Sequence, residues 1–463
     1  TYSTSQNSNQ EDTSQHASGC NCGCCSHNYD HHEMGGRRVQ LGTQDFATSS
    51  ELQAALNIND ASKLQFGPNN KYAQSADGVT YIKYGFYDAT PSFYHPSSKE
   101  NYNFESFTDG MKNATRDILN QIETILNIKF IEATDPNEIQ IGFGQNGADG
   151  VAYAMSPRTQ NTPGFVESGK GQLGDVWIST TVQSTRVNDA ELEPGGDGYY
   201  VLWHEIGHAL GLNHTFAPSV GFKDTVLDTE QISVMSYDTS AWGDLRAETF
   251  MLYDIAALQN LYGANYSYNA SNANWTDLNT GNSVFNISGD AAYTLWDAYG
   301  YDVIDTTSVN TNVVVNLSPG SFSSVGLISN IAIAYGTIIE GVTTGNGDDY
   351  ITGNNANNII HANAGNDTIV GGSGHDYIDG GSGFDTIYAG YGYDTVYGGS
   401  ENDVIYGELG NDILYGQDGS DYINGGHGND SLMGGAGHDT IVGDAGHDYI
   451  DGGSGFDTIY AGY

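Results

Sequence analysis

One stretch decides the fold and the chemistry of this chain: His204-Glu205-Ile206-Gly207-His208-Ala209-Leu210-Gly211-Leu212-Asn213-His214. Apolar residues precede it, which predicts a buried helix, and residues four apart lie on one face of a helix. His204 and His208 can therefore hold one metal ion together, with Glu205 beside them as a base. Gly211 can end the helix in a left-handed conformation, so that His214 returns as a third ligand. Three imidazoles, an open coordination position and a base are what zinc-assisted hydrolysis requires.

A short segment with a methionine, Ser233-Val234-Met235-Ser236-Tyr237, follows the histidine stretch. Such a methionine is usually a core residue, and such a tyrosine is usually a packed ring. After an extended histidine motif, however, the pair resembles the Met-turn of the metzincin metalloproteases. The combination favours a zinc peptidase over a helix that carries two histidines by chance.

Charge and composition exclude several classes of partner. The 463 residues include 14 basic and 57 acidic side chains, a formal net charge of −43. This balance excludes nucleic acid as a natural partner and argues against anionic membrane surfaces. The chain has no apolar run long enough for a membrane span. The four cysteines lie between positions 20 and 25, which rules out a domain held by long-range disulfides.

Residues 1–45 form a polar leader with a composition typical of disorder or of a pro-region. Its cysteines, Cys20, Cys22, Cys24 and Cys25, stand among several histidines. Thiolates beside imidazoles can hold a metal, or one thiolate can cap the catalytic zinc in a latent precursor. The alternative is a flexible tail whose cysteines have no role.

Residues 46–262 are predicted to form an α+β catalytic domain with a mixed five-stranded sheet and long helices. Alternation predicts strands at 78–87, 129–133, 138–143, 151–155 and 175–179. Helical spacing predicts helices at 111–126 and 251–262, besides the one that carries the histidines. An edge strand of such a sheet offers amides to an extended peptide, which suits a protease cleft.

The C-terminal part changes character. Residues 263–343 predict a β-rich connector, and residues 344–460 divide into thirteen nonapeptides of the form Gly-Gly-x-Gly-x-Asp-x-U-x, where U is a large apolar residue. A repeat this short predicts a parallel β-roll over 344–463, with the U residue inside and the glycine turn outside. Glycine carbonyls and aspartates from successive layers would then bind several structural calcium ions. A low-complexity linker would not keep the aspartate register. The predicted ligands are Asp349, Asn358, Asp367, Asp376, Asp385, Asp394, Asp403, Asp412, Asp421, Asp430, Asp439, Asp448 and Asp457, with the glycines Gly345, Gly347, Gly372, Gly374, Gly381, Gly383, Gly426, Gly428, Gly435 and Gly437.

Taken together, the histidine motif, the Met-turn and the calcium repeats resemble the serralysins, which are secreted bacterial metzincins with RTX repeats. Two further stretches, 254–265 and 296–302, resemble the same family in the same order. The resemblance implies one catalytic zinc on His204, His208 and His214, with Tyr237 as a further, displaceable ligand and Glu205 as general base.

The resemblance also implies residues outside the zinc site. A substrate-binding edge strand would contain Val151, Ala152, Tyr153 and Ala154. Connector calcium ligands would be Asp297, Gly300, Asp302 and Glu340, with backbone oxygens at Asn279 and Gly281. The family pattern does not predict the cysteine-rich leader. The family's C-terminal segment with the type I secretion signal is not visible, so export by that route is an expectation.

The sequence thus predicts a secreted, extracellular, monomeric zinc endopeptidase of broad specificity that calcium folds and stabilises. Its partners would be protein or peptide substrates and a proteinaceous inhibitor. Two rivals remain at this point. One is a non-enzymatic RTX adhesin or surface protein with a vestigial zinc site, and the other is a metzincin with a single narrow target.

Overall fold

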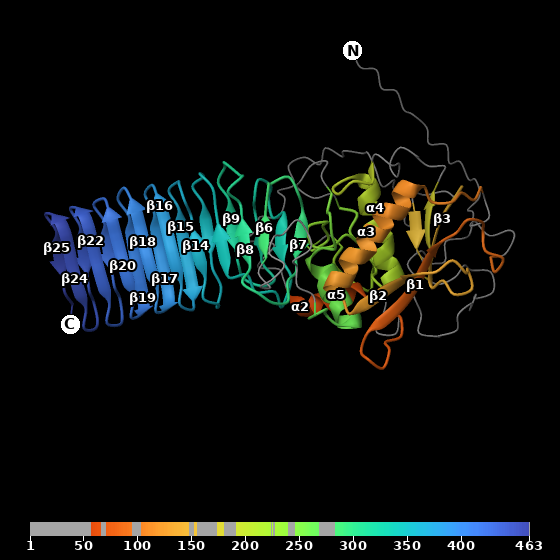
Figure 1. The fold of residues 1–463 in the computed structure, drawn as a ribbon, viewed down its shortest axis with the longest axis horizontal. Coiled ribbons are helices and arrows are strands. Elements are labelled where there is room, and N and C mark those ends of the chain that lie inside the picture. The colour runs from red at the N-terminus through yellow and green to blue at the C-terminus, as the bar shows by residue number, and fades with distance from the viewer. Residues whose placement is uncertain are drawn as a thin grey trace, which may run out of the picture. The chain divides into compact units, whose positions relative to one another are not determined.

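The structure is a computed structural model that describes residues 57–65, 71–94, 103–147, 152–154, 174–179, 191–223, 225, 227–238, 246–267 and 283–462. The leader and its cysteines lie outside these ranges, as do Val151, Asn279 and Gly281. Figure 1 shows helices and a twisted sheet in the N-terminal part and stacked strands in the C-terminal part. No helix within the described ranges has the length and apolarity that a membrane span needs.

The N-terminal part contains one five-stranded sheet in the order β2-β1-β3-β5-β4. Strands β2, β1, β3 and β5 run parallel, whereas β4 pairs antiparallel with β5 at the edge. The predicted mixed sheet is therefore confirmed. The elements are α2 Ile58–Ala61, the 3-10 turn η1 Ser62–Leu64, β1 Thr80–Phe86, α3 Asp109–Ile125, β2 Ile128–Glu132, β3 Ile141–Asn146, β4 Ala152–Ala154, β5 Val176–Ser179, α4 Asp197–Leu210 and α5 Leu252–Tyr262.

One predicted strand has different bounds. The alternation from Glu138 to Phe143 predicts a strand, but β3 begins at Ile141. The reason is a turn in which the Glu138 amide donates to the carbonyl of Asp135, at 2.9 Å. The chain straightens only after this turn, and Gly142 then pairs with Gly85 of β1.

Local sequence explains both long helices. Helix α3 begins where the hydroxyl of Thr108 accepts a hydrogen bond from the Met111 amide, an N-cap, and its apolar positions face the core. Helix α4 is buried on all sides, as its nearly continuous apolar sequence predicts. It ends at Gly211, which has φ of 111° and donates to the carbonyls of Gly207 and His208. This left-handed residue is the predicted turn that returns the chain toward His214.

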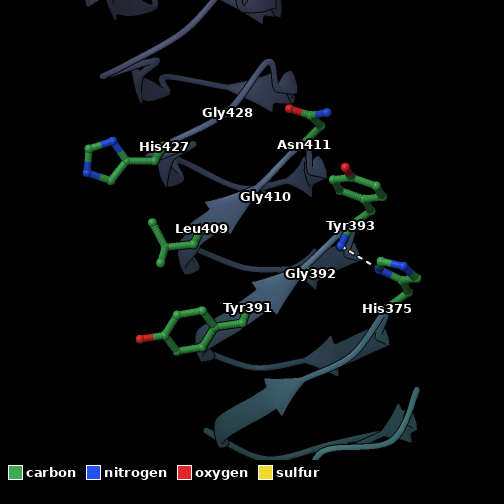
Figure 2. Close-up of a pocket in the computed structure, with 9 residues that line it drawn as sticks. All are labelled: His375, Tyr391, Gly392, Tyr393, Leu409, Gly410, Asn411, His427 and Gly428. Atoms are coloured by element: carbon green, nitrogen blue, oxygen red, sulfur yellow. Dashed lines mark hydrogen bonds between the residues drawn. The ribbon is translucent and has the colours of Figure 1, made fainter.

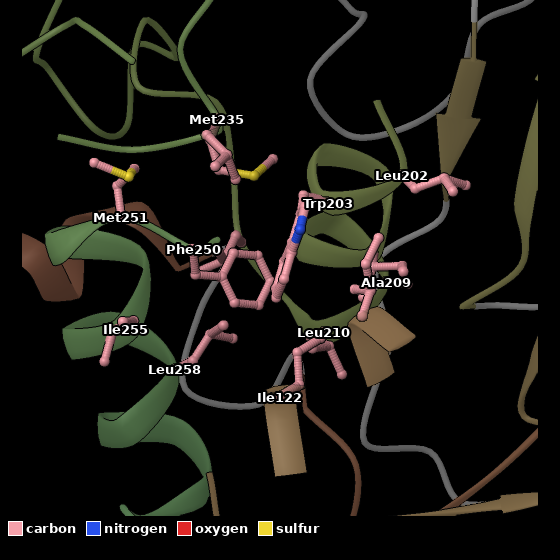
Figure 3. Packing of buried hydrophobic residues seen from close by; sticks show 14 of the residues in the cluster. Ile122, Leu202, Trp203, Ala209, Leu210, Met235, Phe250, Met251, Ile255 and Leu258 are labelled. Carbon is pink, nitrogen blue, oxygen red and sulfur yellow. The ribbon is translucent and has the colours of Figure 1, made fainter. Parts of the chain in front are cut away.

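The core beside α4 is filled by large side chains. Figure 3 shows Trp203 of α4 against Phe250, with Leu258 of α5 nearby and Met235 above them. The rings of Trp203 and Phe250 meet edge to face, with centroids 4.7 Å apart. All four side chains are fully buried. The helix that carries the histidines is therefore held in place by close packing against these side chains.

The C-terminal part is a parallel β-roll of two long sheets. One has nine strands in the order β24-β22-β20-β18-β16-β14-β12-β8-β6, and the other has eight in the order β25-β23-β21-β19-β17-β15-β13-β9; a third, three-stranded sheet has the order β10-β11-β7. The strands are β6 Val284–Asn286, β7 Tyr293–Leu295, β8 Val303–Asp305, β9 Val314–Asn316, β10 Phe322–Ser323, β11 Ile331–Ile333, β12 Gly341–Thr343, β13 Tyr350–Thr352, β14 Ile359–His361, β15 Thr368–Ser373, β16 Tyr377–Ser382, β17 Thr386–Gly392, β18 Thr395–Ser400, β19 Val404–Gly410, β20 Ile413–Asp418, β21 Tyr422–Asn424, β22 Ser431–Gly437, β23 Thr440–Val442, β24 Tyr449–Gly455 and β25 Thr458–Tyr460.

Two nonapeptides make one layer of the roll. Ile351 therefore pairs with Ile369, and Ile369 with Ile387. The U residues from Ile351 to Ile441 are fully buried between the sheets, as predicted, whereas Ile459 in the last layer is 48% exposed. The sheets begin before the first nonapeptide, because three connector strands extend one of them: β12 pairs with β14, β8 with β12 and β6 with β8.

Candidate metal centres

The structure brings His204, His208 and His214 together at one point. Their ligand nitrogens all lie within 4.8 Å of one another. The Nε2 atom of His214 is 3.2 Å from Nε2 of His204 and 3.0 Å from Nε2 of His208. Helix α4 supplies two of these side chains and the turn after Gly211 supplies the third.

The other ring nitrogens fix the tautomers. Nδ1 of His204 lies 2.6 Å from the carbonyl of Val234, and Nδ1 of His208 lies 2.8 Å from the carbonyl of Leu212. A carbonyl can only accept, so each Nδ1 donates and each Nε2 carries a lone pair. Burial, together with the neighbouring His208, lowers the pKa of His204 to about 3. Neutral imidazoles whose lone pairs converge fit zinc, which His nitrogen binds at about 2.0–2.1 Å.

Glu205 and Tyr237 complete the predicted site. Glu205 is 97% buried on α4, next to the first histidine. The hydroxyl of Tyr237 lies 2.9 Å from Nε2 of His214, and its ring stacks on His204 with centroids 5.4 Å apart. Tyr237 is nevertheless 46% exposed, which fits a side chain that can move toward and away from the metal.

Met235 lies beneath the histidines and contacts α4 at a glycine. A Cβ added to Gly207 would lie 2.7 Å from the sulfur of Met235 and 3.4 Å from Phe250. The helix therefore needs glycine at this position, although glycine is a poor helix former. Met235 has no polar group directed at the site and acts as its apolar floor.

Two aspartates that the sequence reading did not single out connect the parts of the site. Asp254 of α5 accepts hydrogen bonds from the Ser233 hydroxyl at 2.5 Å and the Val234 amide at 2.8 Å. Asp254 thereby fixes Val234, the residue whose carbonyl bonds to His204, and burial raises the pKa of Asp254 to about 7. Asp228 accepts from the hydroxyls of Thr215 and Ser236, the neighbours of His214 and Tyr237.

The candidate substrate strand lies at the sheet edge. Residues Ala152, Tyr153 and Ala154 form β4, which is the end strand of the sheet, and Val151 falls outside the described residues. The hydroxyl of Tyr153 accepts a hydrogen bond from the Asn146 amide at 2.8 Å. The edge is therefore anchored to β3 while its backbone stays at the margin of the sheet.

The roll places its aspartates in two inner ladders. In most of them one carboxylate oxygen, Oδ1, accepts from the backbone amide of the aspartate 18 residues earlier; the Asp385 amide, for example, donates to Asp403 at 2.9 Å. Asp376 accepts instead from the amide of Asn358, and Asp349 from the amide of Val313. The other oxygen, Oδ2, is buried and has no hydrogen-bond partner among the residues that the structure describes. This holds for Asp349, Asp367, Asp376, Asp385, Asp394, Asp403, Asp412, Asp421, Asp430, Asp439 and Asp448.

Space for a cation adjoins these unpartnered oxygens. A Cβ added to Gly380 would lie 2.5 Å from Oδ2 of Asp385 and 2.6 Å from the carbonyl oxygen of Gly398. Oxygens from two layers thus border a space that only glycine leaves open. An all-oxygen surrounding of buried carboxylates and carbonyls is what calcium prefers, so the residues present fit that ion.

Asn358 differs from the aspartates around it. Its Oδ1 accepts from the Asn354 amide at 2.9 Å, and its side-chain amide donates to Oδ1 of Asn354 at 3.1 Å and to the carbonyl of Glu340 at 3.3 Å. Within the described residues, every polar atom of this side chain therefore has a partner. Asp457, in the last layer, is partly exposed and accepts from the Asp439 amide at 3.1 Å.

Three of the predicted connector ligands also converge. Asp297 and Asp302 both bond to Ser283, at 2.7 and 2.9 Å, and Glu340 accepts from the Asp302 amide at 2.8 Å. Burial, together with the charges of Asp297 and Glu340, raises the pKa of Asp302 to about 8. Such a group of acids fits calcium. Gly300 lies in the same loop, with φ of 131°.

An open depression of about 690 Å³ lies on the turns of the roll. Figure 2 shows its glycine floor, with Tyr391, Leu409 and His427 on one side and His375, Tyr393 and Asn411 on the other. The side chains of these two sets point away from each other (Figure 2). Because polar groups do not converge there, the depression lacks the feature that marks a small-molecule site.

Family profiles match both parts of the chain. The matrixin profile matches residues 97–245. The profile of the RTX calcium-binding nonapeptide repeat matches five overlapping stretches, 343–378, 379–414, 397–432, 406–441 and 424–459. The first match includes the histidine cluster, and the others include the aspartate ladders.

Three known proteins are similar to part of this chain. Metalloprotease AprA of Pseudomonas entomophila is 32% identical over 298 residues, which cover 59% of this chain and 59% of the relative. Serralysin of Photorhabdus luminescens is 31% identical over 58% of this chain and 57% of its own length. Serralysin C of Dickeya chrysanthemi is 35% identical over 38% and 40%. The chain thus matches about three fifths, or less, of the length of these relatives. The chain thus combines a region that matches the matrixin profile and brings three histidines together with a roll of RTX repeats that follows it along the chain, and it is similar to the serralysins over part of their length.

Proposed function

We propose that this chain is a secreted zinc endopeptidase that hydrolyses peptide bonds of proteins with broad specificity, and that calcium folds and stabilises it. The observation that carries the proposal is the convergence of three imidazole nitrogens beside Glu205, with the Tyr237 hydroxyl 2.9 Å from His214. The proposed organisation is a leader at 1–45, a catalytic domain at 46–262, a connector at 263–343 and a calcium roll at 344–463.

In this proposal, zinc on His204, His208 and His214 would act as a Lewis acid and lower the pKa of water. Glu205 takes a proton from the attacking water and then gives it to the leaving amine. The hydroxyl of Tyr237 donates to the oxyanion that forms on the scissile carbonyl. One such donor is usually worth about 2.7–4 kcal/mol of transition-state stabilisation.

Substrate would bind in extended form along β4, as an added antiparallel strand. Backbone pairing does not depend on side-chain identity, which supports broad specificity. The names of the relatives support protein substrates, and the RTX repeats support type I export to the extracellular medium. A monomeric state and control by a proteinaceous inhibitor belong to the same proposal, and gel filtration of the calcium-loaded protein tests the former.

The decisive experiment replaces Glu205 with glutamine. Casein digestion in excess calcium should fall to background while the protein still binds one zinc, because the three imidazoles are untouched. Glu138→Gln is the matched control, since its side chain is 55% exposed and pairs with Lys83 at the surface. Appreciable turnover by Glu205→Gln would refute its role as base. A wild-type protein that binds zinc but digests no casein would instead favour the adhesin with a vestigial site.

A further inference from the structure

A third aromatic ring completes the surroundings of Tyr237, and the proposed mechanism does not use it. Phe216, two residues after the third histidine, stacks on the ring of His214 with centroids 4.6 Å apart and planes 15° apart. The same ring contacts Tyr237, with centroids 4.8 Å apart. Tyr237 therefore has His204 against one part of its ring and Phe216 against another.

The backbone around Phe216 is fixed on both sides. Thr215 is fully buried, and its hydroxyl donates to Asp228. The Ala217 amide donates to the carbonyl of His214 at 3.1 Å, which closes a turn around Phe216. The position of the Phe216 ring is thus set by its own side-chain torsions and by stacking on His214. The ring can therefore restrict the movement of the neighbouring Tyr237 side chain.

Such a restriction matters for Tyr237, because its side chain is 46% exposed. An exposed side chain samples several rotamers unless its neighbours select one. We propose that Phe216 is a positioning residue: its ring, held by stacking on His214, keeps the Tyr237 ring where its hydroxyl reaches the metal site. The inference rests on the proposed function, in which that hydroxyl serves the metal and the oxyanion.

A double-mutant cycle on the full chain, in calcium, tests the inference. The variants are Phe216→Ala, Tyr237→Phe and the combination of both. Phe216→Ala should lower kcat about tenfold, roughly the size of one or two aromatic contacts, with a smaller change in KM. In the Tyr237→Phe background the same substitution should change kcat little, because no hydroxyl remains to be positioned.

The dissociation constant for zinc gives a second readout that does not depend on activity. Phe216→Ala should weaken zinc binding, and should weaken it less when Tyr237 is already phenylalanine. Additive effects in both cycles would overturn the proposal, since they would make Phe216 a structural residue only. If the wild type has no peptidase activity, the proposed function fails, and the zinc cycle alone decides the positioning role.

Three further variants separate positioning from packing. Phe216→Tyr keeps the ring face and should retain nearly wild-type kcat. Phe216→Leu keeps bulk without a ring face, so it should resemble Phe216→Ala in kcat and also serves if the alanine variant does not fold. Phe384→Ala removes a ring that is 57% exposed on the roll, and should leave both readouts unchanged. A leucine variant with wild-type kcat and zinc affinity would contradict the stacking argument.

Discussion

The histidine site and the β-roll treat their buried polar groups in opposite ways. At the histidines, Nδ1 of His204 and of His208 already bonds to a backbone carbonyl, so the rings are oriented by the protein itself. In the roll, the inward carboxylates leave Oδ2 buried without a partner, from Asp349 to Asp448 with the exception of Asn358. The two helix histidines are therefore held in place without a metal ion, whereas the carboxylates of the roll still lack a partner for one oxygen each.

The difference separates two uses of metal ions. A buried polar group without a partner costs about 1–3 kcal/mol, and more if it is charged. The roll repeats this cost in nearly every half-layer, and calcium would remove it by giving each oxygen a cation. Zinc, in contrast, would add reactivity at histidines whose rings the protein already orients through hydrogen bonds to backbone carbonyls. We therefore expect calcium to control folding and zinc to control chemistry.

Calcium withdrawal should have the largest effect. At pH 8, a calcium-selective chelator should abolish most of the strand signal in far-ultraviolet circular dichroism of the full chain. Tryptophan emission should change far less, because all five tryptophans lie at or before Trp296 and report on the region before the nonapeptides. A strand spectrum that persists without calcium at this pH would show that folding of the roll does not depend on calcium, and would remove the contrast with the histidine site.

Acidification should partly replace calcium. Burial, together with the neighbouring charges of Asp385 and Asp421, raises the pKa of Asp403 to about 8. Burial and neighbouring aspartates likewise raise the pKa of Asp367 and of Asp412 to about 7. The folded pKa exceeds the unfolded value of about 3.9, so the folded roll binds more protons between these values. Its stability without calcium is therefore greatest at low pH and is lost as pH rises through about 7–8.

The measurement is circular dichroism of the calcium-free chain between pH 5 and pH 8.5. Strand signal should increase as pH falls. With calcium present the trend should reverse, because protons then compete with the ion. A calcium-free roll that becomes less ordered on acidification would contradict the burial of these carboxylates.

Exchanging aspartate and asparagine should have a smaller effect, in opposite directions at two positions. Asp403→Asn removes one buried charge, so the calcium-free roll should gain about 1–3 kcal/mol while the calcium concentration for half-folding rises. Asn358→Asp adds a carboxylate beside Asn354 and Glu340, and should do the reverse. Calcium titrations followed by circular dichroism compare the two variants. Equal shifts of the half-folding calcium concentration, with the same sign, would show that position 358 does not differ from the aspartate positions.

Gly207→Ala should have the smallest effect, confined to the histidine site. Alanine gains about 1 kcal/mol of helix propensity, but its Cβ would lie 2.7 Å from the Met235 sulfur. Displacing a packed side chain costs about 1–3 kcal/mol, so we expect a net loss on the order of 1 kcal/mol. Thermal unfolding followed by tryptophan emission should show it, while the calcium midpoint of the roll stays unchanged. A shift of that midpoint would mean that the two regions are coupled.

The sequence determined the features that follow local periodicity. A four-residue spacing and a glycine stop were enough to predict the helix with His204 and His208 and the return of His214. A nine-residue period was enough to predict the roll and its buried U residues, because every layer repeats the same environment. The family resemblance added Tyr237 as a possible ligand, through its place after Met235.

Only the tertiary structure decided the contacts between distant residues. Asp254 accepts a hydrogen bond from Val234, 20 positions earlier in the sequence, and the Phe216 ring contacts Tyr237, which is also distant in sequence. No short sequence spacing predicts either contact. The roll's sheets begin at Val284, because connector strands without the repeat still pair in register. Likewise, the unpartnered oxygen of each aspartate becomes visible only when the layers are stacked. Periodicity predicts the environment that a residue shares with its equivalents in other repeats. Which distant residue it contacts depends on how the elements pack in the tertiary structure.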